Sequence, residues 1–266
     1  MNATDFIYGG ESLSSYGCMI VSFDNTSSMS AINSDSQRSF EQVSMFNGTY
    51  QPFTHHTYDD CVKMSFSIIK DPELTDEKEF SQDDIRTLKR WLNSPVAQKL
   101  YLLDEDYEDL YWEGVFNVND LYFNGQAYGL SLEFTSNRPF GLQGDRSYTG
   151  TLAANESFTI RDTSDEIGHI YPTLEITCKA DGTLDLHNSY DDRHTIIENC
   201  VSGEVITFSP RMQITSSVTG HEVYNDFNYR FLRIGNTYDE RDNTITTTLP
   251  VDYKLTYSPI AKVVAG

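Results

Sequence analysis

The sequence has few basic residues and no long apolar run, and both shortages restrict what the protein can do. Its 266 residues include 19 Lys and Arg against 40 Asp and Glu, a formal net charge of −21. Nucleic-acid binding draws its affinity from clustered Lys and Arg, so no sequence-specific nucleic-acid partner is expected. No apolar run reaches the roughly 18 residues of a membrane span, so no membrane partner is expected either. The first ten residues lack the features of a signal peptide, which predicts a soluble protein made in a cytoplasm.

Motifs for catalysis and cofactor binding are also missing. The chain contains no Gly-x-Ser-x-Gly elbow, phosphate-binding loop, His-Glu-x-x-His helix or dinucleotide fingerprint. The cysteines are too far apart for a zinc knuckle or a thiol redox motif, so buried free thiols are expected at Cys18, Cys61, Cys178 and Cys200. We therefore expect no enzyme activity, no catalytic residue, no cofactor and no metal site.

Short segments that alternate apolar and polar residues dominate the chain. Turn pairs separate many of them, for example Asn124-Gly125, Asp181-Gly182 and Ser202-Gly203. Hydrophobic residues make up 38% of the sequence and aromatic residues 13%, enough for cores built from strands. This pattern predicts a mainly β protein made of sandwiches or barrels.

One segment predicts a helix near residues 82–93. Ser81 can cap its start, with Asp84 at the third helical position. Apolar residues then share one helical stripe, and Asn93-Ser94-Pro95 ends it. The residues of this stripe are Ile85, Leu88, Trp91 and Leu92.

A stretch rich in Pro, Gly and polar residues runs from Asn137 to Gly150 and indicates a domain boundary. We expect an N-terminal β-rich domain, split-barrel or sandwich-like and with one helix, over residues 1–140. Residues 141–266 show no convincing helix and are predicted to form a C-terminal β-sandwich.

In their order and spacing, four stretches resemble the distal tail proteins of long-tailed phages and prophages of Gram-positive bacteria. The first two are a Gly- and Ser-containing opening pair of strands and a helix ending in Trp-Leu. The other two are strands with an acidic, Tyr-rich turn closing on Pro-Phe, and the start of the second domain. They read DFIYGGESLSSYGCMIVSF, LTDEKEFSQDDIRTLKRWLNSP, KLYLLDEDYEDLYWEGVFNVNDLYFNGQAYGLSLEFTSNRPF, and YPTLEITCKADGTLDLHN followed by SGEVITFSP.

The resemblance implies a structural protein of the virion tail tip, assembled in the host cytoplasm. It implies a ring of six copies built by the first domain and continuing the tail tube, with a galectin-like or jelly-roll sandwich carried outside. The implied partners are the chain itself, the tail tube protein above the ring, and a host-facing tail-associated or tail fibre protein below. Larger members of this family carry inserted carbohydrate-binding modules, and we expect none within these 266 residues.

Two clusters of polar residues could bind ions, but a plainer interpretation is favoured for each. The acidic run at 104–109 lacks the spacing of a calcium loop and is interpreted as a solvated turn between strands. His55-His56 precedes Asp59, Asp60 and Cys61, but adjacent strand residues point to opposite faces, so an exposed loop is favoured over a metal site. Surface roles are expected for three further histidines, His187, His194 and His221.

Aromatic residues offer the remaining candidate surfaces. One group is assigned to core and inter-subunit packing, with sugar stacking as the alternative: Tyr107, Tyr111, Trp112, Tyr122 and Tyr128. The poorly alternating segment 39–58 is interpreted as a loop or hairpin arm that reaches a neighbouring subunit through Phe40, Met45, Phe46, Tyr50 and Phe53.

Two alternatives to the structural role remain open. One is a glycan-binding β-sandwich that acts as a receptor-binding protein of the same tail tip. The other is a β-sandwich glycoside hydrolase, for which the sequence offers no acid and base pair. If a ring forms and DNA passes through it, we expect the 19 basic residues to lie mostly away from the channel, because they would hold the duplex.

Overall fold

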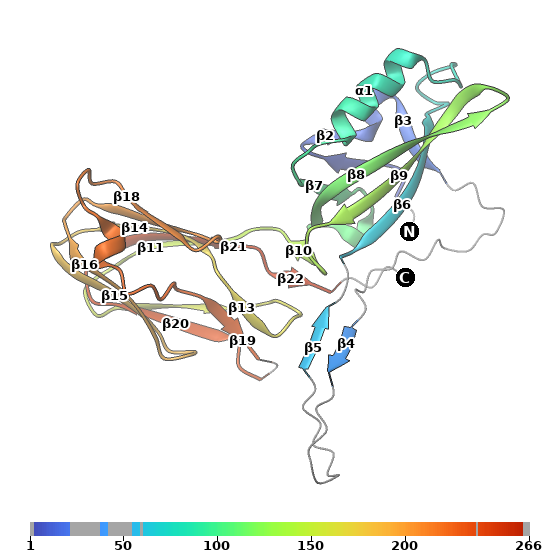
Figure 1. Cartoon of the computed structure of the whole chain (residues 1–266). Helices are drawn as coiled ribbons and strands as arrows, with labels where there is room; N and C mark the ends of the chain where they lie inside the picture. The colour runs from blue at the N-terminus through green and yellow to red at the C-terminus, as the bar shows by residue number, and fades with distance from the viewer. Residues whose placement is uncertain (1–2, 22–37, 42–54, 59–60, 238, 263–266) are drawn as a thin grey trace, which may run out of the picture. The chain divides into compact units, whose positions relative to one another are not determined.

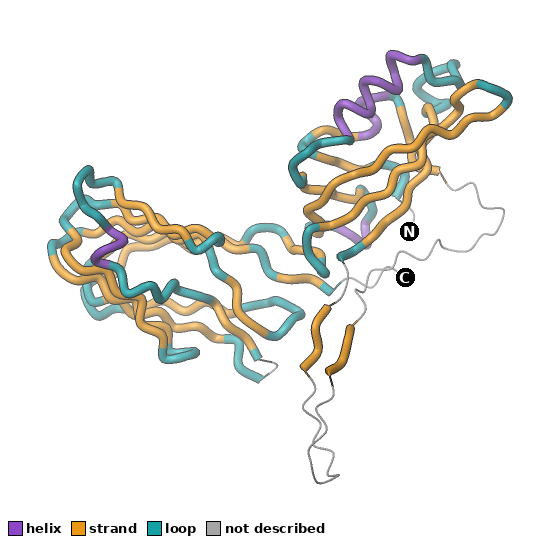
Figure 2. Tube along the Cα trace, in the orientation of Figure 1, coloured by secondary structure: helices purple, strands orange, loops and turns teal. Residues whose placement is uncertain are grey.

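The computed structural model describes residues 3–21, 38–41, 55–58, 61–237 and 239–262, and the fold is mainly β (Figures 1 and 2). The chain forms two compact units, each with its own hydrophobic core. Unit 1 holds the described residues up to Leu142 together with Ala261 and Lys262, and unit 2 spans Gln143–Ile260. The chain therefore passes between the units twice.

Unit 1 is built on a nine-stranded sheet. Seven strands follow the order β2-β1-β7-β8-β9-β6-β3, while β10 pairs with β8 and β22. Figure 1 shows α1 lying over one face of this sheet. The bounds are β1 Phe6–Tyr8, β2 Glu11–Ser12, β3 Cys18–Val21, β6 Lys63–Lys70, β7 Gln98–Leu102, β8 Leu110–Phe123, β9 Gln126–Ser136, β10 Gly141–Gln143 and β22 Ile260–Ala261. Two 3₁₀ turns accompany them, η1 at Leu13–Tyr16 and η2 at Glu105–Tyr107.

The longest hairpin of unit 1 joins β8 to β9 through the predicted Asn124-Gly125 turn. Both residues have positive φ, 50° and 82°, as a two-residue type I′ turn requires. Within this hairpin Gly114 lies against β9, where an added Cβ would fall 2.3 Å from the carbonyl oxygen of Thr135. Only glycine allows the two strands to approach this closely.

The predicted helix is present as α1, Gln82–Leu92, and starts with a full capping box. The Ser81 hydroxyl accepts from the backbone N–H of Asp84, and the Asp84 carboxylate accepts from the backbone N–H of Ser81. Ile85, Leu88 and Leu92 are buried in the unit 1 core. This confirms the expected stripe.

Trp91, the fourth residue of that stripe, connects the helix to the first strand. Its ring stacks on Tyr16 at 4.5 Å and on Phe6 at 5.8 Å between centroids. Its indole Nε1–H donates to the backbone carbonyl of Tyr8 at 3.0 Å. The polar edge of this large side chain is therefore satisfied while its face packs.

Unit 2 is a β-sandwich of one five-stranded and one four-stranded sheet. The first has the order β11-β21-β14-β17-β18 and the second β12-β20-β15-β16, with β13 and β19 paired separately. Its apolar core includes Ile160, Leu174, Ile206 and Leu255. The bounds are β11 Arg146–Leu152, β12 Ser157–Arg161, β13 Gly168–Ile170, β14 Thr173–Cys178, β15 Gly182–Asn188, β16 Arg193–Cys200, β17 Val205–Ser209, β18 Gln213–Ser216, β19 Ile234–Asn236, β20 Asp242–Thr247 and β21 Val251–Tyr257.

Three details differ from the sequence-based expectations. Unit 2 carries one short helix, α2 at Val223–Asp226, in a half where no helix was expected. Ala261 is buried and belongs to unit 1, because β22 pairs with β10, so the second unit ends before residue 266. All four cysteines are free, but Cys61 is only half-buried, unlike the three buried thiols.

Candidate functional site

The base of the expected arm is a two-stranded antiparallel ladder. Strand β4, Arg38–Glu41, pairs with β5, His55–Tyr58, and Phe40 stands opposite His56 in the register. The expectation of a loop at His55-His56 was therefore wrong, because both residues belong to a paired strand. The other arm residues, Met45, Phe46, Tyr50 and Phe53, lie outside the described residues, as do Asp59 and Asp60.

The aromatic group of unit 1 is divided between its core and the end of a hairpin. Tyr107, Tyr111 and Trp112 are buried, as expected of packing residues. Tyr122 is 58% exposed. Its neighbour Phe123, which was not among the candidates predicted from the sequence, is 75% exposed beside the Asn124-Gly125 turn. This hairpin end presents apolar surface to solvent.

The acidic run forms the expected turn between strands β7 and β8. It contains η2, and the side chains of Glu105, Glu108 and Asp109 are exposed. Asp109 has φ 64°, a left-handed conformation that Asp tolerates in turns. The carboxylates of these three residues face solvent.

In unit 2 one histidine is buried between two carboxylates, which contradicts the expected surface role of His221. Its Nδ1 lies 2.5 Å from Glu204 Oε1, and its Nε2 lies 3.1 Å from Asp226 Oδ2. The side chain of His221 is 8% exposed and that of Glu204 is 0% exposed. Helix α2 supplies Asp226, so the single helical turn completes this arrangement.

The electrostatics of this group favour charged His221 and Glu204. Burial alone would lower the pKa of His221, but the hydrogen bond and charge of Glu204 outweigh it and raise the pKa above its usual value. Burial alone would raise the pKa of Glu204, but hydrogen bonds from Ser216, the backbone of Val201 and His221 lower it. When His221 is protonated, it forms a buried ion pair with Glu204; Glu204 directly precedes β17, and His221 follows β18.

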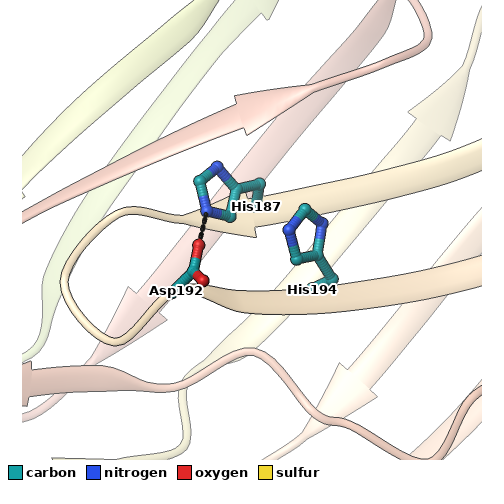
Figure 3. Close-up of side chains that lie close together, drawn as sticks. All are labelled: His187, Asp192 and His194. Atoms are coloured by element: carbon teal, nitrogen blue, oxygen red, sulfur yellow. Dashed lines mark hydrogen bonds and ion pairs between the residues drawn. The ribbon is translucent and has the colours of Figure 1, made fainter.

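The other two histidines meet on the outer face of the β15-β16 hairpin, so they are not scattered (Figure 3). His187 and His194 are directly opposite in the register, and their rings stack at 4.3 Å and 16°. His187 Nε2 lies 2.9 Å from Asp192 Oδ1, and His194 Nδ1 lies 2.8 Å from Asp185 Oδ2. A sequence signal was present, since Asp-x-His occurs twice, at 185–187 and 192–194. Period-two spacing places Asp185 and His187 on one face of β15, whereas Asp192 lies in the turn before β16.

Comparison with known proteins agrees with this architecture. A family described as phage tail protein N-terminal domain matches residues 1–138, and one described as phage tail C-terminal domain matches residues 140–257. A search of curated protein sequences finds no match. Among the described residues, no helix is long and apolar enough to cross a membrane.

Among solved structures, the fold is similar to that of the Dit protein (gp 19.1) of phage SPP1. The TM-score is 0.65 at 10% sequence identity, and the alignment covers 97% of this chain and 99% of that one. The SPP1 protein is described as a paradigm of the hub adsorption apparatus in phages that infect Gram-positive bacteria. Both domain matches together span almost the whole sequence, and the chain belongs to this family of two-domain phage tail proteins.

Proposed function

We propose that this protein is the distal tail protein of a long, non-contractile phage tail. In this role about six copies form a ring that continues the tail tube and holds the host-adsorption apparatus below it. The observation that carries the proposal is the Dit-like fold, which extends over nearly the full length of both chains. The function is geometric, and no catalytic step is assigned to it.

A closed ring needs two different surfaces on each copy, because neighbours in a cycle meet head to tail. We assign one of them to the arm between β3 and β6, through Phe40, Met45, Phe46, Tyr50 and Phe53. The antiparallel pairing of β4 with β5 supports this assignment, since these two strands flank residues 42–54. The exposed Tyr122 and Phe123 are a second candidate contact on unit 1.

Light scattering after size-exclusion chromatography tests the ring, followed by negative-stain microscopy of the same peak. The expected particle has six times the 30.3 kDa mass of the chain. A monomer at every concentration, including in the presence of the tail tube protein, would contradict the proposal. An atomic map of the ring would test its channel, where few of the 19 basic residues are expected.

A second candidate function is glycan binding by unit 2 at the same tail tip. Two tyrosines of unit 2 favour it, since Tyr224 is 48% and Tyr229 66% exposed, and exposed aromatic rings can stack on sugars. A glycan array separates the two functions. Selective glycan binding that is lost in Tyr224→Ser/Tyr229→Ser supports a receptor-binding role. If no glycan binds selectively, only the structural role is supported.

A further inference from the structure

We propose that the β15-β16 hairpin of unit 2 binds a divalent transition-metal ion, with Zn²⁺ as the best match. Its ligands are His187, Asp192 and His194, whose ligand atoms all lie within 4.8 Å of one another. No metal site was expected from the sequence, where each histidine taken alone indicates a surface residue. The site lies within unit 2 and does not depend on ring formation.

The backbone explains why the two imidazoles meet. His187 and His194 are opposite each other on neighbouring antiparallel strands, so both side chains leave the same face of the sheet. Leu186 and Thr195, the adjacent residues, are buried on the other face. The rings are partly exposed, at 35% for the side chain of His187 and 44% for that of His194, so an ion from solvent can reach them.

A hydrogen bond to Asp185 sets the tautomer of His194. A carboxylate only accepts hydrogen bonds, so the contact between Asp185 Oδ2 and His194 places the ring proton on Nδ1. The lone pair of His194 Nε2 then remains available. A carboxylate that holds the second nitrogen of a ligating histidine is the usual outer-shell partner in metal sites.

Asp192 supplies the third ligand from the turn between the strands. Its Oδ1 lies 2.9 Å from His187 Nε2, close to the separation of roughly 3.3 Å between two ligand atoms that are each about 2.0 Å from a tetrahedral zinc. If the proton on His187 Nε2 moves to Nδ1 of the same neutral ring, an ion can bind between Nε2 and Asp192 Oδ1. The backbone of Asp192 has φ 50°, which directs it out of the strand path into the turn.

The ligand set selects the kind of ion. Two imidazoles and one carboxylate suit Zn²⁺, Ni²⁺ or Cu²⁺, whereas Ca²⁺ and Mg²⁺ prefer sites made only of oxygen ligands. Three protein ligands leave one tetrahedral position for water or for a group from another molecule. The ion would connect β15, β16 and the turn between them.

Isothermal titration of the full-length protein with zinc chloride tests the site. We expect His187→Gln/His194→Gln to lose one equivalent of bound Zn²⁺ that the unaltered protein takes up. Asp185→Asn should keep the stoichiometry but weaken the affinity by about 10-fold to 100-fold, as loss of an outer-shell partner does. His169→Gln, which changes an exposed histidine of the same unit, is the matched control and should bind as the unaltered protein does.

Two further measurements keep the test decisive. Circular dichroism must show that each variant is folded, and cobalt chloride titrations, followed by visible absorption, should give the same loss in the double variant. With calcium chloride, the unaltered protein and His187→Gln/His194→Gln should give the same binding heat. Equal uptake of Zn²⁺ by the unaltered protein and by folded His187→Gln/His194→Gln would overturn the proposal, as would no stoichiometric uptake by the unaltered protein.

Discussion

The buried pair of His221 and Glu204 leads to a quantitative prediction for unit 2. Replacing His221 by Leu leaves the fully buried Glu204 carboxylate with hydrogen bonds only from Ser216 and the backbone of Val201. Removing one partner of a buried ion pair costs about 3 to 5 kcal/mol, because the remaining charge stays buried and uncompensated. We expect the free energy of unfolding of unit 2 to fall by about this much near pH 6.

The pH dependence gives an independent test of the same pair. The pKa of His221 is raised on folding. Its contribution to the free energy of unfolding is therefore complete below the unfolded pKa of 6.5 and is lost as pH rises through the folded pKa of His221. The pKa of Glu204 is lowered, so its contribution is present above 4.5 and is lost as pH falls through its folded value. Between pH 6.5 and the folded pKa of His221, stability should fall by up to about 1.4 kcal/mol per pH unit.

The positions of the tryptophans allow the two units to be followed separately. Trp91 and Trp112 are the two tryptophans of the chain, and both lie in unit 1. In urea titrations, His221→Leu should shift the circular dichroism transition of unit 2 while the Trp fluorescence transition of unit 1 stays in place.

A double-mutant cycle isolates the interaction. Glu204→Gln/His221→Leu should destabilise unit 2 less than the sum of its two single variants. A cost below about 1 kcal/mol for His221→Leu, with an unchanged slope above pH 6.5, would refute the ion-pair reasoning.

Three further predictions concern unit 1 and the arm. Ser81→Ala removes the hydroxyl that caps α1 and should lower the stability of unit 1 by about 1 kcal/mol in Trp-monitored urea unfolding, whereas Ser81→Asp should retain most of it. Gly114→Ala places a Cβ against Thr135 and Phe134 of β9 and should cost about 3 kcal/mol or more, while Gly125→Asn at the exposed turn should cost far less; equal costs would contradict the close approach of the strands. A fourfold variant tests the arm: Met45→Ser/Phe46→Ser/Tyr50→Ser/Phe53→Ser. It should leave the circular dichroism of the chain unchanged but prevent ring formation in light scattering. Rings of unchanged mass would contradict a role of the arm in contacts between subunits.

Features set by neighbours in the sequence could be predicted. Helix α1 depends on Ser81, Asp84 and an apolar stripe within 11 residues, and the β8-β9 turn depends on Asn124-Gly125. Both follow local rules of capping and backbone conformation, so both appear where the sequence places them. The mainly β character follows from the same kind of local alternation.

Features made by distant segments could not be predicted. The return of Ala261 to unit 1 depends on pairing between β22 and β10, more than a hundred residues apart. The burial of His221 depends on Glu204, 17 residues away, and on a helical turn too short to have a periodic signal. The proximity of His187 and His194 depends on residues that are close in the sequence, because the two Asp-x-His motifs lie on either side of one hairpin turn.

If this protein is the distal tail protein proposed above, it occupies the end of the phage tail farthest from the capsid. Immunogold electron microscopy of intact phage particles, with antibodies against unit 2, locates it there directly. We expect gold only at that end of the tail. Gold distributed along the tail tube, or located at the capsid end, would contradict it.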